Sequence, residues 1–242
     1  MLLILYRIYQ ILIMCPIIVV ATILTAVITV IGSAVGLGRT WGYYPEILWS
    51  RLFCWIAFVR VSVKGHENID SKTSYVFTPN HQSAYDIFTV YGYLGHNFRW
   101  MMKHGLRSIP FVGWACARSG QIFVDNSSVK ATRHTMAEAE QQLRGGMSLV
   151  VFPEGARTWD GRMRNFKKGA FKLAQEFHLP IVPLTIDGAF DVMPRYAKLP
   201  RPGHITLTIH KPIAPPEDEH DILRVMEMAH EVVSSSLPER EQ

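Results

Sequence analysis

A stretch of 31 residues without a charged side chain, residues 8–38, is the feature that most constrains the fold of this chain. Within it, residues 11–31 are apolar apart from Pro16 and three threonines. About 20 apolar residues suffice for a helix to cross the hydrocarbon core of a bilayer. The run exceeds the roughly 7–15 apolar residues of a secretory signal, and no A-x-A site follows it. We therefore expect a membrane element, either spanning or re-entrant, instead of a cleaved leader or a buried soluble helix.

A second apolar segment, PEILWSRLFCWIAFVR (residues 45–60), follows closely and carries three charges. Aromatic side chains crowd around it, as at a headgroup interface: Trp41, Tyr43, Tyr44, Trp49 and Trp55. We interpret it as an interfacial helix that can pair with the first; the alternative is a core helix of the globular part. Small polar residues share one face of the first helix, as in helix–helix contacts within lipid: Thr22, Thr25, Thr29 and Ser33.

Basic residues are distributed unevenly around the apolar run. Only Arg7 precedes it, whereas Arg39, Arg51, Arg60 and Lys64 follow it. Because basic residues concentrate on the cytoplasmic side of membrane segments, we expect the rest of the chain to lie there, at a bacterial inner membrane. The three cysteines fit neither a disulfide framework nor metal-ligand spacing, which agrees with a reducing compartment: Cys15, Cys54 and Cys116.

From residue 61 onward, short β-rich runs alternate with helical patterns, which indicates an α/β domain. The predicted strands are 61–64, 75–78, 99–102, 122–124, 148–152, 181–186 and 205–209, and the predicted helices are 83–94, 128–144, 166–177 and 218–235. We expect a mixed, mostly parallel central sheet flanked by helices. The expected organisation is an N-terminal membrane-associated two-helix element at 1–60 and an α/β domain at 61–242.

A histidine and an aspartate five residues apart follow a predicted strand, in NHQSAYD (residues 80–86). On one continuous helix they would face apart, since residues five apart are rotated by about 140°. Pro79 ends the strand and Ser83 is a good N-cap, which lets His81 lie in the loop and Asp86 in the first helical turn. The carboxylate would then orient the imidazole, whose free nitrogen takes a proton. The alternative is a simple capping box formed by Ser83 and Asp86.

A second polar motif, FPEGART (residues 152–158), follows another predicted strand. Gly155 permits close approach of the backbone, Arg157 offers a bidentate fork for a phosphate, and Glu154 could accept hydrogen bonds from hydroxyls. Positive charge continues into the next helix start at Arg162, Arg164, Lys167 and Lys168. These features suit an anion, although an exposed turn followed by a solvated basic face would look the same.

Several other chemistries lack their sequence signals. The chain has no G-x-S-x-G elbow, no P-loop, no H-E-x-x-H and no G-x-G-x-x-G. The remaining nine histidines are scattered, so we expect no metal site and no cofactor. We also expect no nucleic-acid partner, because no reader motif accompanies the net charge of +5.

Taken in order, these blocks resemble the motifs of the glycerolipid acyltransferase family, which includes the 1-acylglycerol-3-phosphate acyltransferases. NHQSAYD resembles the N-H-x4-D motif, and FPEGART resembles F-P-E-G-T-R-S with Ala156 in place of threonine. Three further blocks match in order: KHGLRSIPFVGW (103–114), GQIFVDN (120–126) and IVPLTI (181–186). The resemblance runs from about residue 61 to residue 210 and includes the apolar N-terminus.

The resemblance implies that His81 is the general base and Asp86 its orienting partner, so that a glycerol hydroxyl attacks an acyl thioester without an acyl-enzyme. It implies a phosphate-binding set formed by Glu154, Gly155, Arg157 and Lys103, and we add Asn80 and Lys167 to the expected substrate-binding residues. The donor would be acyl-CoA or acyl carrier protein. The acceptor would be the sn-2 hydroxyl of lysophosphatidic acid, and the product phosphatidic acid would return to the bilayer.

One departure from the family pattern concerns the acceptor. The second motif usually ends in Asp-Arg, whereas here it ends in Asp125-Asn126. Lys130 or Arg133 could replace that arginine, or the acceptor could be another lysolipid, such as a lyso-ornithine lipid. Two further alternatives stay open: a membrane-anchored hydrolase in which the His–Asp pair activates water, and a lipid-binding protein without turnover.

Overall fold

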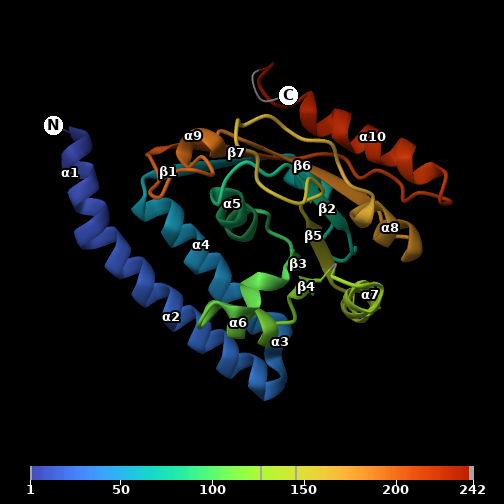
Figure 1. Cartoon of the computed structure of the whole chain (residues 1–242), viewed down its shortest axis with the longest axis horizontal. Helices are drawn as coiled ribbons and strands as arrows, with labels where there is room; N and C mark the ends of the chain where they lie inside the picture. The colour runs from blue at the N-terminus through green and yellow to red at the C-terminus, as the bar shows by residue number, and fades with distance from the viewer. Residues whose placement is uncertain (1, 126, 145, 240–242) are drawn as a thin grey trace.

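The computed structural model describes residues 2–125, 127–144 and 146–239. Its centre is a seven-stranded sheet in the order β1-β7-β6-β2-β5-β3-β4, in which only β6 and β7 pair antiparallel (Figure 1). The strands are β1 Val59–Lys64, β2 Val76–Pro79, β3 Phe98–Lys103, β4 Ile122–Val124, β5 Ser148–Val151, β6 Ile181–Asp187 and β7 Gly203–Ile209. The predicted α/β class with a mixed, mostly parallel sheet is confirmed.

All seven predicted strands are present, with limits shifted by at most two residues. The central strands β2 and β6 are buried along almost their whole length, as expected for strands covered on both faces. The predicted helices appear as α4 Tyr44–Ile56, α5 Tyr85–Tyr93, α7 Val129–Arg144, α8 Gly169–Glu176 and α10 Asp221–Ser234. The short helices α6 Val112–Arg118 and α9 Ala189–Val192 were not predicted, because each has too few residues to show a helical period.

Helices cover both faces of the sheet. On one face, α4 and α5 bury Cys54, Tyr85 and Leu94 against the strands. On the other face, α8 and α10 pack around Phe171 and Val225, and α7 adds a smaller cluster next to β4 and β5. Figure 1 shows the N-terminal helices and α10 on opposite sides of the molecule.

The N-terminal apolar run forms one helical stretch from Leu2 to Trp41, 40 residues long with a mean hydropathy of 2.9 in its best window. It comprises α1 Leu2–Tyr9, α2 Cys15–Gly32 and α3 Gly38–Trp41, joined by π-helical turns at Gln10–Met14 and Ser33–Leu37. The second turn bends at Gly36, whose φ is 84°. Only 11% of the apolar window is buried, so the helix has the length and composition to cross a membrane.

The predicted pairing of the two apolar segments is confirmed. Trp49 Nε1 in α4 donates to Thr22 Oγ1 at 2.9 Å, and Thr29 Oγ1 donates to Glu46 Oε1 at 2.8 Å. The polar face of the first helix therefore meets α4. The opposite side of α4 packs on α5 and buries Cys54, so α4 is also a core helix of the globular part.

Candidate active site

The two polar motifs meet because of the order of the strands. β2 and β5 are parallel neighbours, and each motif begins where its strand ends. The carboxyl ends of parallel strands share one edge of a sheet, and ligands of open α/β sheets bind at that edge where the strand order reverses. After β2 the chain forms β3 and then β4 on one side of it, and β5 takes the place between β2 and β3. The next strand, β6, lies on the other side of β2. The strand order therefore reverses beside β2, which ends shortly before His81.

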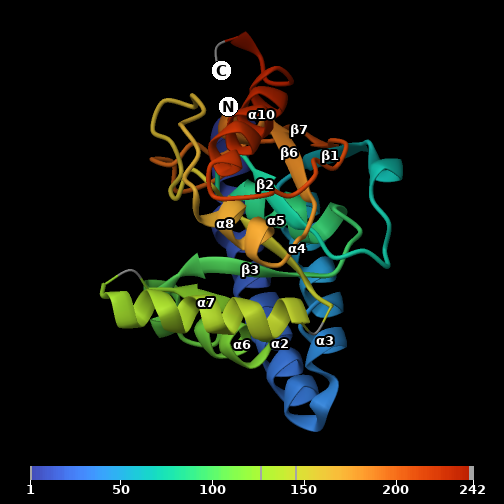
Figure 2. The same cartoon turned by 90° about the vertical axis from the view of Figure 1, so that its right-hand side faces the viewer.

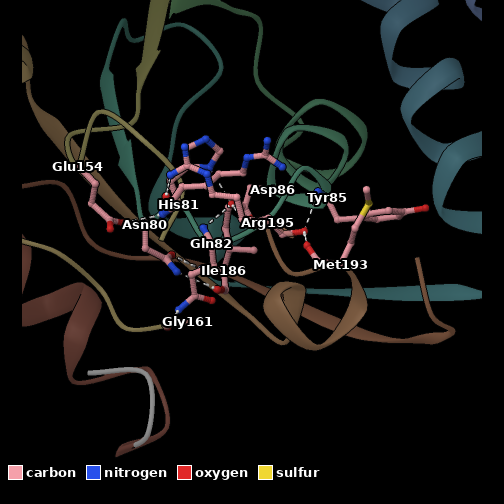
Figure 3. A network of polar contacts seen from close by, with 12 residues as sticks. Asn80, His81, Gln82, Tyr85, Asp86, Glu154, Gly161, Ile186, Met193 and Arg195 are labelled. Atoms are coloured by element: carbon pink, nitrogen blue, oxygen red, sulfur yellow. Dashed lines mark hydrogen bonds and ion pairs between the residues drawn. The ribbon is translucent and has the colours of Figure 1, made fainter. Parts of the chain in front are cut away.

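The centre of the site is a hydrogen bond between a loop histidine and a buried carboxylate. His81 Nδ1 lies 2.8 Å from Asp86 Oδ2; Asp86 is fully buried, and the side chain of His81 is 13% exposed. The same oxygen accepts from the backbone N–H groups of Gln82 at 2.7 Å and Ser83 at 2.8 Å. Asp86 therefore fixes the turn that leads into α5 and also orients the imidazole, so the Ser83–Asp86 contact of a capping box and the His81–Asp86 pair occur together (Figure 3).

The imidazole is fixed from a second direction by aromatic stacking. The rings of His81 and Phe152 stack with centroids 3.7 Å apart and planes within 14°, and Trp100 stacks behind Phe152 at 5.1 Å. With Nδ1 bonded to Asp86, Nε2 is the nitrogen left to act, and no hydrogen bond to it is found among the described residues. An imidazole held by a carboxylate in this way can accept a proton at Nε2.

Glu154 connects the loop that carries His81 with the loop of the second motif. Its Oε1 accepts from the backbone N–H of His81 at 2.6 Å, and its Oε2 accepts from that of Arg164 at 2.9 Å. Burial raises the pKa of Glu154 to about 7, against the lowering effect of these two hydrogen bonds. The sequence placed Glu154 among the residues that bind substrate hydroxyls; the structure shows both oxygens engaged by backbone, which is the geometry of a residue that positions His81.

Asn80 is also predicted to bind substrate, and its polar side-chain atoms are likewise bonded to the backbone. Its side chain is fully buried. Its Nδ2 donates to the carbonyl oxygen of Ile186 at 3.0 Å, and its Oδ1 accepts from the N–H of Ile186 at 2.7 Å. The amide thus ties the loop after β2 to β6 and does not face the open edge of the site.

The glycine of the second motif has a lysine beside it. Gly155 has a φ of 78°, a left-handed conformation that favours glycine, and a Cβ there would lie 2.8 Å from Lys167 Nζ. Arg157 follows two residues later and is partly exposed, while Lys103 is exposed at the carboxyl end of β3. The structure therefore brings Gly155 and Lys167 into contact and places Lys103 farther along the same edge.

Arg195, which the sequence did not single out, contacts the second motif, and the segment that carries it also contacts the first. Arg195 donates to the carbonyl oxygen of Arg157 at 2.6 Å and stacks its guanidinium 4.4 Å from the ring centroid of Trp159. The residues before it reach the other loop, since Ser83 Oγ donates to the carbonyl of Met193 at 2.8 Å. Figure 3 shows Arg195 and Met193 within this polar network. No local pattern marks Arg195, because its partners Arg157 and Trp159 lie almost 40 residues away in the chain.

Two sequence-based predictions remain, one about Asn126 and one about metal binding. Asn126 lies outside the described residues. Among the residues that the structure describes, no three His, Cys, Asp or Glu side chains gather as ligands of a metal ion would.

The fold and the site define an α/β protein that carries a histidine–carboxylate pair and a basic glycine-containing loop at the carboxyl edge of its sheet. Residues 60–187 match the family model described as Acyltransferase, and the chain belongs to that family. The sequence-based resemblance to glycerolipid acyltransferases is thereby confirmed.

Named relatives agree with this assignment. The chain is 33% identical over 177 residues to the chloroplastic 1-acyl-sn-glycerol-3-phosphate acyltransferase of Arabidopsis thaliana, covering 72% of this chain and 49% of that protein. It is 37% identical over 158 residues to that of Saccharomyces cerevisiae, covering 64% and 52%. The chain thus spans about half the length of these relatives. The crystal structure of the 1-acyl-sn-glycerophosphate (LPA) acyltransferase from Thermotoga maritima superposes with a TM-score of 0.71 at 29% identity, covering 81% of this chain and 78% of that one.

Proposed function

We propose that this protein transfers a fatty acyl group from acyl-CoA or acyl carrier protein to the sn-2 hydroxyl of lysophosphatidic acid, making phosphatidic acid. The observation that carries the proposal is the oriented imidazole of His81, with Nδ1 held by Asp86 and Nε2 open, at the edge that carries the basic loop. The relatives named 1-acyl-sn-glycerol-3-phosphate acyltransferases support the choice of acceptor.

The reaction requires one base and no covalent intermediate on the protein. In the proposed step, Nε2 of His81 takes the proton of the acceptor hydroxyl as its oxygen attacks the thioester carbonyl. The C–S bond then breaks, and the departing thiolate receives the proton from the imidazolium. Asp86 stabilises the imidazolium through Nδ1–H. The fixed geometry lowers the barrier because the ring need not reorient when the hydroxyl arrives.

The acceptor phosphate would bind to the cations around Gly155. Arg157 supplies a planar fork that matches two phosphate oxygens, and Lys167 supplies an ammonium in contact with the glycine. Lys103, on the same edge, would extend this positive surface toward the acidic donor. Glu154 and Asn80 would act indirectly, by holding the backbone on which His81 sits.

The proposed location of the protein at a membrane follows from its apolar N-terminus and its α/β domain. We propose an N-terminal membrane-associated element at residues 1–60 and an α/β acyltransferase domain at 61–242, with the domain on the cytoplasmic face of a bacterial inner membrane. The exposed apolar surface of the Leu2–Trp41 helix and the basic residues that follow it support this orientation. A diacyl product would then enter the bilayer from a site that already lies at its surface.

An acceptor and donor panel in reconstituted vesicles tests the proposal. Labelled acyl-CoA and acyl carrier protein would each be offered with lysophosphatidic acid, other lysophospholipids and a lyso-ornithine lipid. We expect phosphatidic acid as the main labelled lipid. A different diacyl product would keep the chemistry and change the acceptor, whereas release of free fatty acid without any diacyl product would indicate the hydrolase, and binding without product would indicate a lipid-binding protein.

A further inference from the structure

A short segment between β3 and β4 exposes an unusual number of large apolar side chains. It comprises the 3₁₀ turn His104–Ser108 and helix α6 Val112–Arg118. Its exposed apolar residues are Leu106, Ile109, Phe111 and Trp114, and Trp114 is 59% exposed. We call these four residues the α6 patch. Apolar side chains gathered on a surface mark a contact with a protein or a membrane more often than isolated ones do.

The backbone of the segment that carries these side chains is tightly turned. Phe111 has a φ of 62°, a conformation that L-residues with a bulky side chain avoid. Gly113 lies so close to Arg107 that a Cβ would come within 2.1 Å of the Arg107 carbonyl oxygen, and its N–H donates to Ile109 at 2.8 Å. A backbone this tightly turned keeps the patch exposed instead of letting it fold back onto the protein.

The α6 patch lies beside the N-terminal helix, whose outer surface is also apolar. Helix α6 packs against α2, and the end of α6 meets the turn before α4, where a Cβ on Gly42 would lie 2.5 Å from the Cβ of Ser119. Figures 1 and 2 both show α6 beside α2 and α3. The α2 side chains that point away from the protein are exposed and apolar, including Leu24, Val27 and Ile31.

The charged side chains within the segment and just before it are basic, and Asp125, which interacts with His104, is the first acidic residue after it. Residues 87–124 contain no Asp or Glu. They contain four basic residues, of which Arg99 is buried, while Lys103, Arg107 and Arg118 are exposed and flank the patch. Exposed apolar side chains bordered by lysine and arginine are typical of surfaces that enter the interfacial region of an anionic bilayer.

We infer that the α6 patch inserts into the interfacial layer of an anionic lipid bilayer, as a second membrane contact beside the N-terminal helix. The segment begins directly after Lys103, at the edge of the sheet that carries His81. Two separate contacts with the membrane define the orientation of the protein on it more closely than one contact does. Insertion therefore holds the open edge of the site at the level of the headgroups. This consequence for the site rests on the proposed function; insertion itself does not.

An environment-sensitive dye on the full-length chain tests insertion without any turnover. NBD would be attached to Trp114→Cys in a background with Cys15→Ala and Cys116→Ala, which keeps the buried Cys54. The matched control is Leu223→Cys on α10, an exposed apolar position on the opposite face of the sheet. The protein is bound to vesicles of phosphatidylcholine and phosphatidylglycerol, with nitroxide-labelled acyl chains as the quencher.

We expect a blue-shifted, lipid-quenched dye at position 114 and a water-like, unquenched dye at position 223. A dye at 114 as hydrated as that at 223 on vesicle-bound protein would overturn the inference. In vesicles of phosphatidylcholine alone the signal at 114 should weaken, and an unchanged signal would contradict the role of the basic flank.

A double variant connects insertion to the use of membrane-bound substrate. Leu106→Ser with Trp114→Ser should slow acylation of lysolipid in vesicles about fivefold, while the rate in detergent micelles stays unchanged. The control is Leu223→Ser with Met228→Ser on α10, which should change neither rate. Equal loss in vesicles and micelles would show that the segment serves folding and would count against the inference.

Discussion

Asp86 Oδ2 lies 2.8 Å from Nδ1 of His81 and is at the same time the acceptor for the N–H groups of Gln82 and Ser83. A single oxygen therefore fixes the start of α5, the path of the loop and the orientation of the imidazole. The other carboxylate oxygen, Oδ1, is buried without a hydrogen bond among the described residues, so all the hydrogen bonds found for this carboxylate converge on Oδ2. The base of the proposed reaction is positioned by the same carboxylate oxygen that fixes the turn before α5.

Replacing Asp86 by asparagine should separate these two tasks. The amide oxygen can still accept one or two of the N–H groups, but an amide stabilises the imidazolium far less than a carboxylate. We expect kcat to fall by roughly 10³–10⁴-fold with the KM for lysophosphatidic acid changed little. Steady-state kinetics checks this, with circular dichroism to confirm the fold. A loss of less than about tenfold would contradict the proposed role of the carboxylate.

Arg157 should act in binding and not in the chemical step. Arg157→Lys keeps the charge but loses the planar fork, so we expect the KM for lysophosphatidic acid to rise about tenfold while kcat stays within a few-fold. The control is Arg162→Lys, an exposed residue of the same loop region. An unchanged KM, or an effect confined to kcat, would argue against phosphate binding by Arg157.

Arg195 is expected to be a positioning residue. Arg195→Ala removes both the hydrogen bond to the Arg157 carbonyl and the stacking on Trp159, which should let the basic loop shift. We expect the KM for the acceptor to rise several-fold, and Arg195→Lys should rescue it only in part, because lysine cannot bond and stack in the same way. Combining Arg195→Ala with Arg157→Ala should cost less than the sum of both. Full additivity would show that the two arginines act independently.

The buried carboxyl of Glu154 predicts a pH dependence of stability. Its pKa in the folded protein is about 7, against 4.5 for the ordinary group, so the folded state keeps a proton that the unfolded chain releases. The stability it contributes is full below pH 4.5 and is lost as pH rises through 7. Glu154→Gln cannot titrate. Thermal unfolding of both proteins from pH 4.5 to 8 should show the wild-type Tm falling relative to that of the variant; parallel curves would contradict the raised pKa.

Much of the fold could be predicted because its signals are local. The strands β2, β5 and β6 are short apolar runs bounded by proline, glycine or polar residues, and their limits were found within two residues. The His81–Asp86 pair was also predictable, since a strand end, an N-cap and a carboxylate three residues later describe its geometry within seven residues of sequence.

The roles of Glu154 and Asn80 could not be predicted in the same way. Both are polar residues beside a motif, and sequence cannot show whether such a side chain faces solvent or backbone. Glu154 bonds to His81 of another loop and to Arg164, ten residues further along its own loop, and Asn80 bonds to Ile186 of β6. The same limit applies to Arg195, whose contacts exist only once β6 and the residues after it are in place. Long-range hydrogen bonds depend on the assembled sheet, which no local pattern encodes.

The most direct test of the account is the rate of phosphatidic acid formation by His81→Ala in vesicles, with labelled acyl donor and lysophosphatidic acid. Removing the base should lower kcat by roughly 10²–10⁴-fold while the affinity for the acceptor is retained, because Arg157 and Lys167 remain in place. Phosphatidic acid formation at the wild-type rate by the His81→Ala protein would contradict the account.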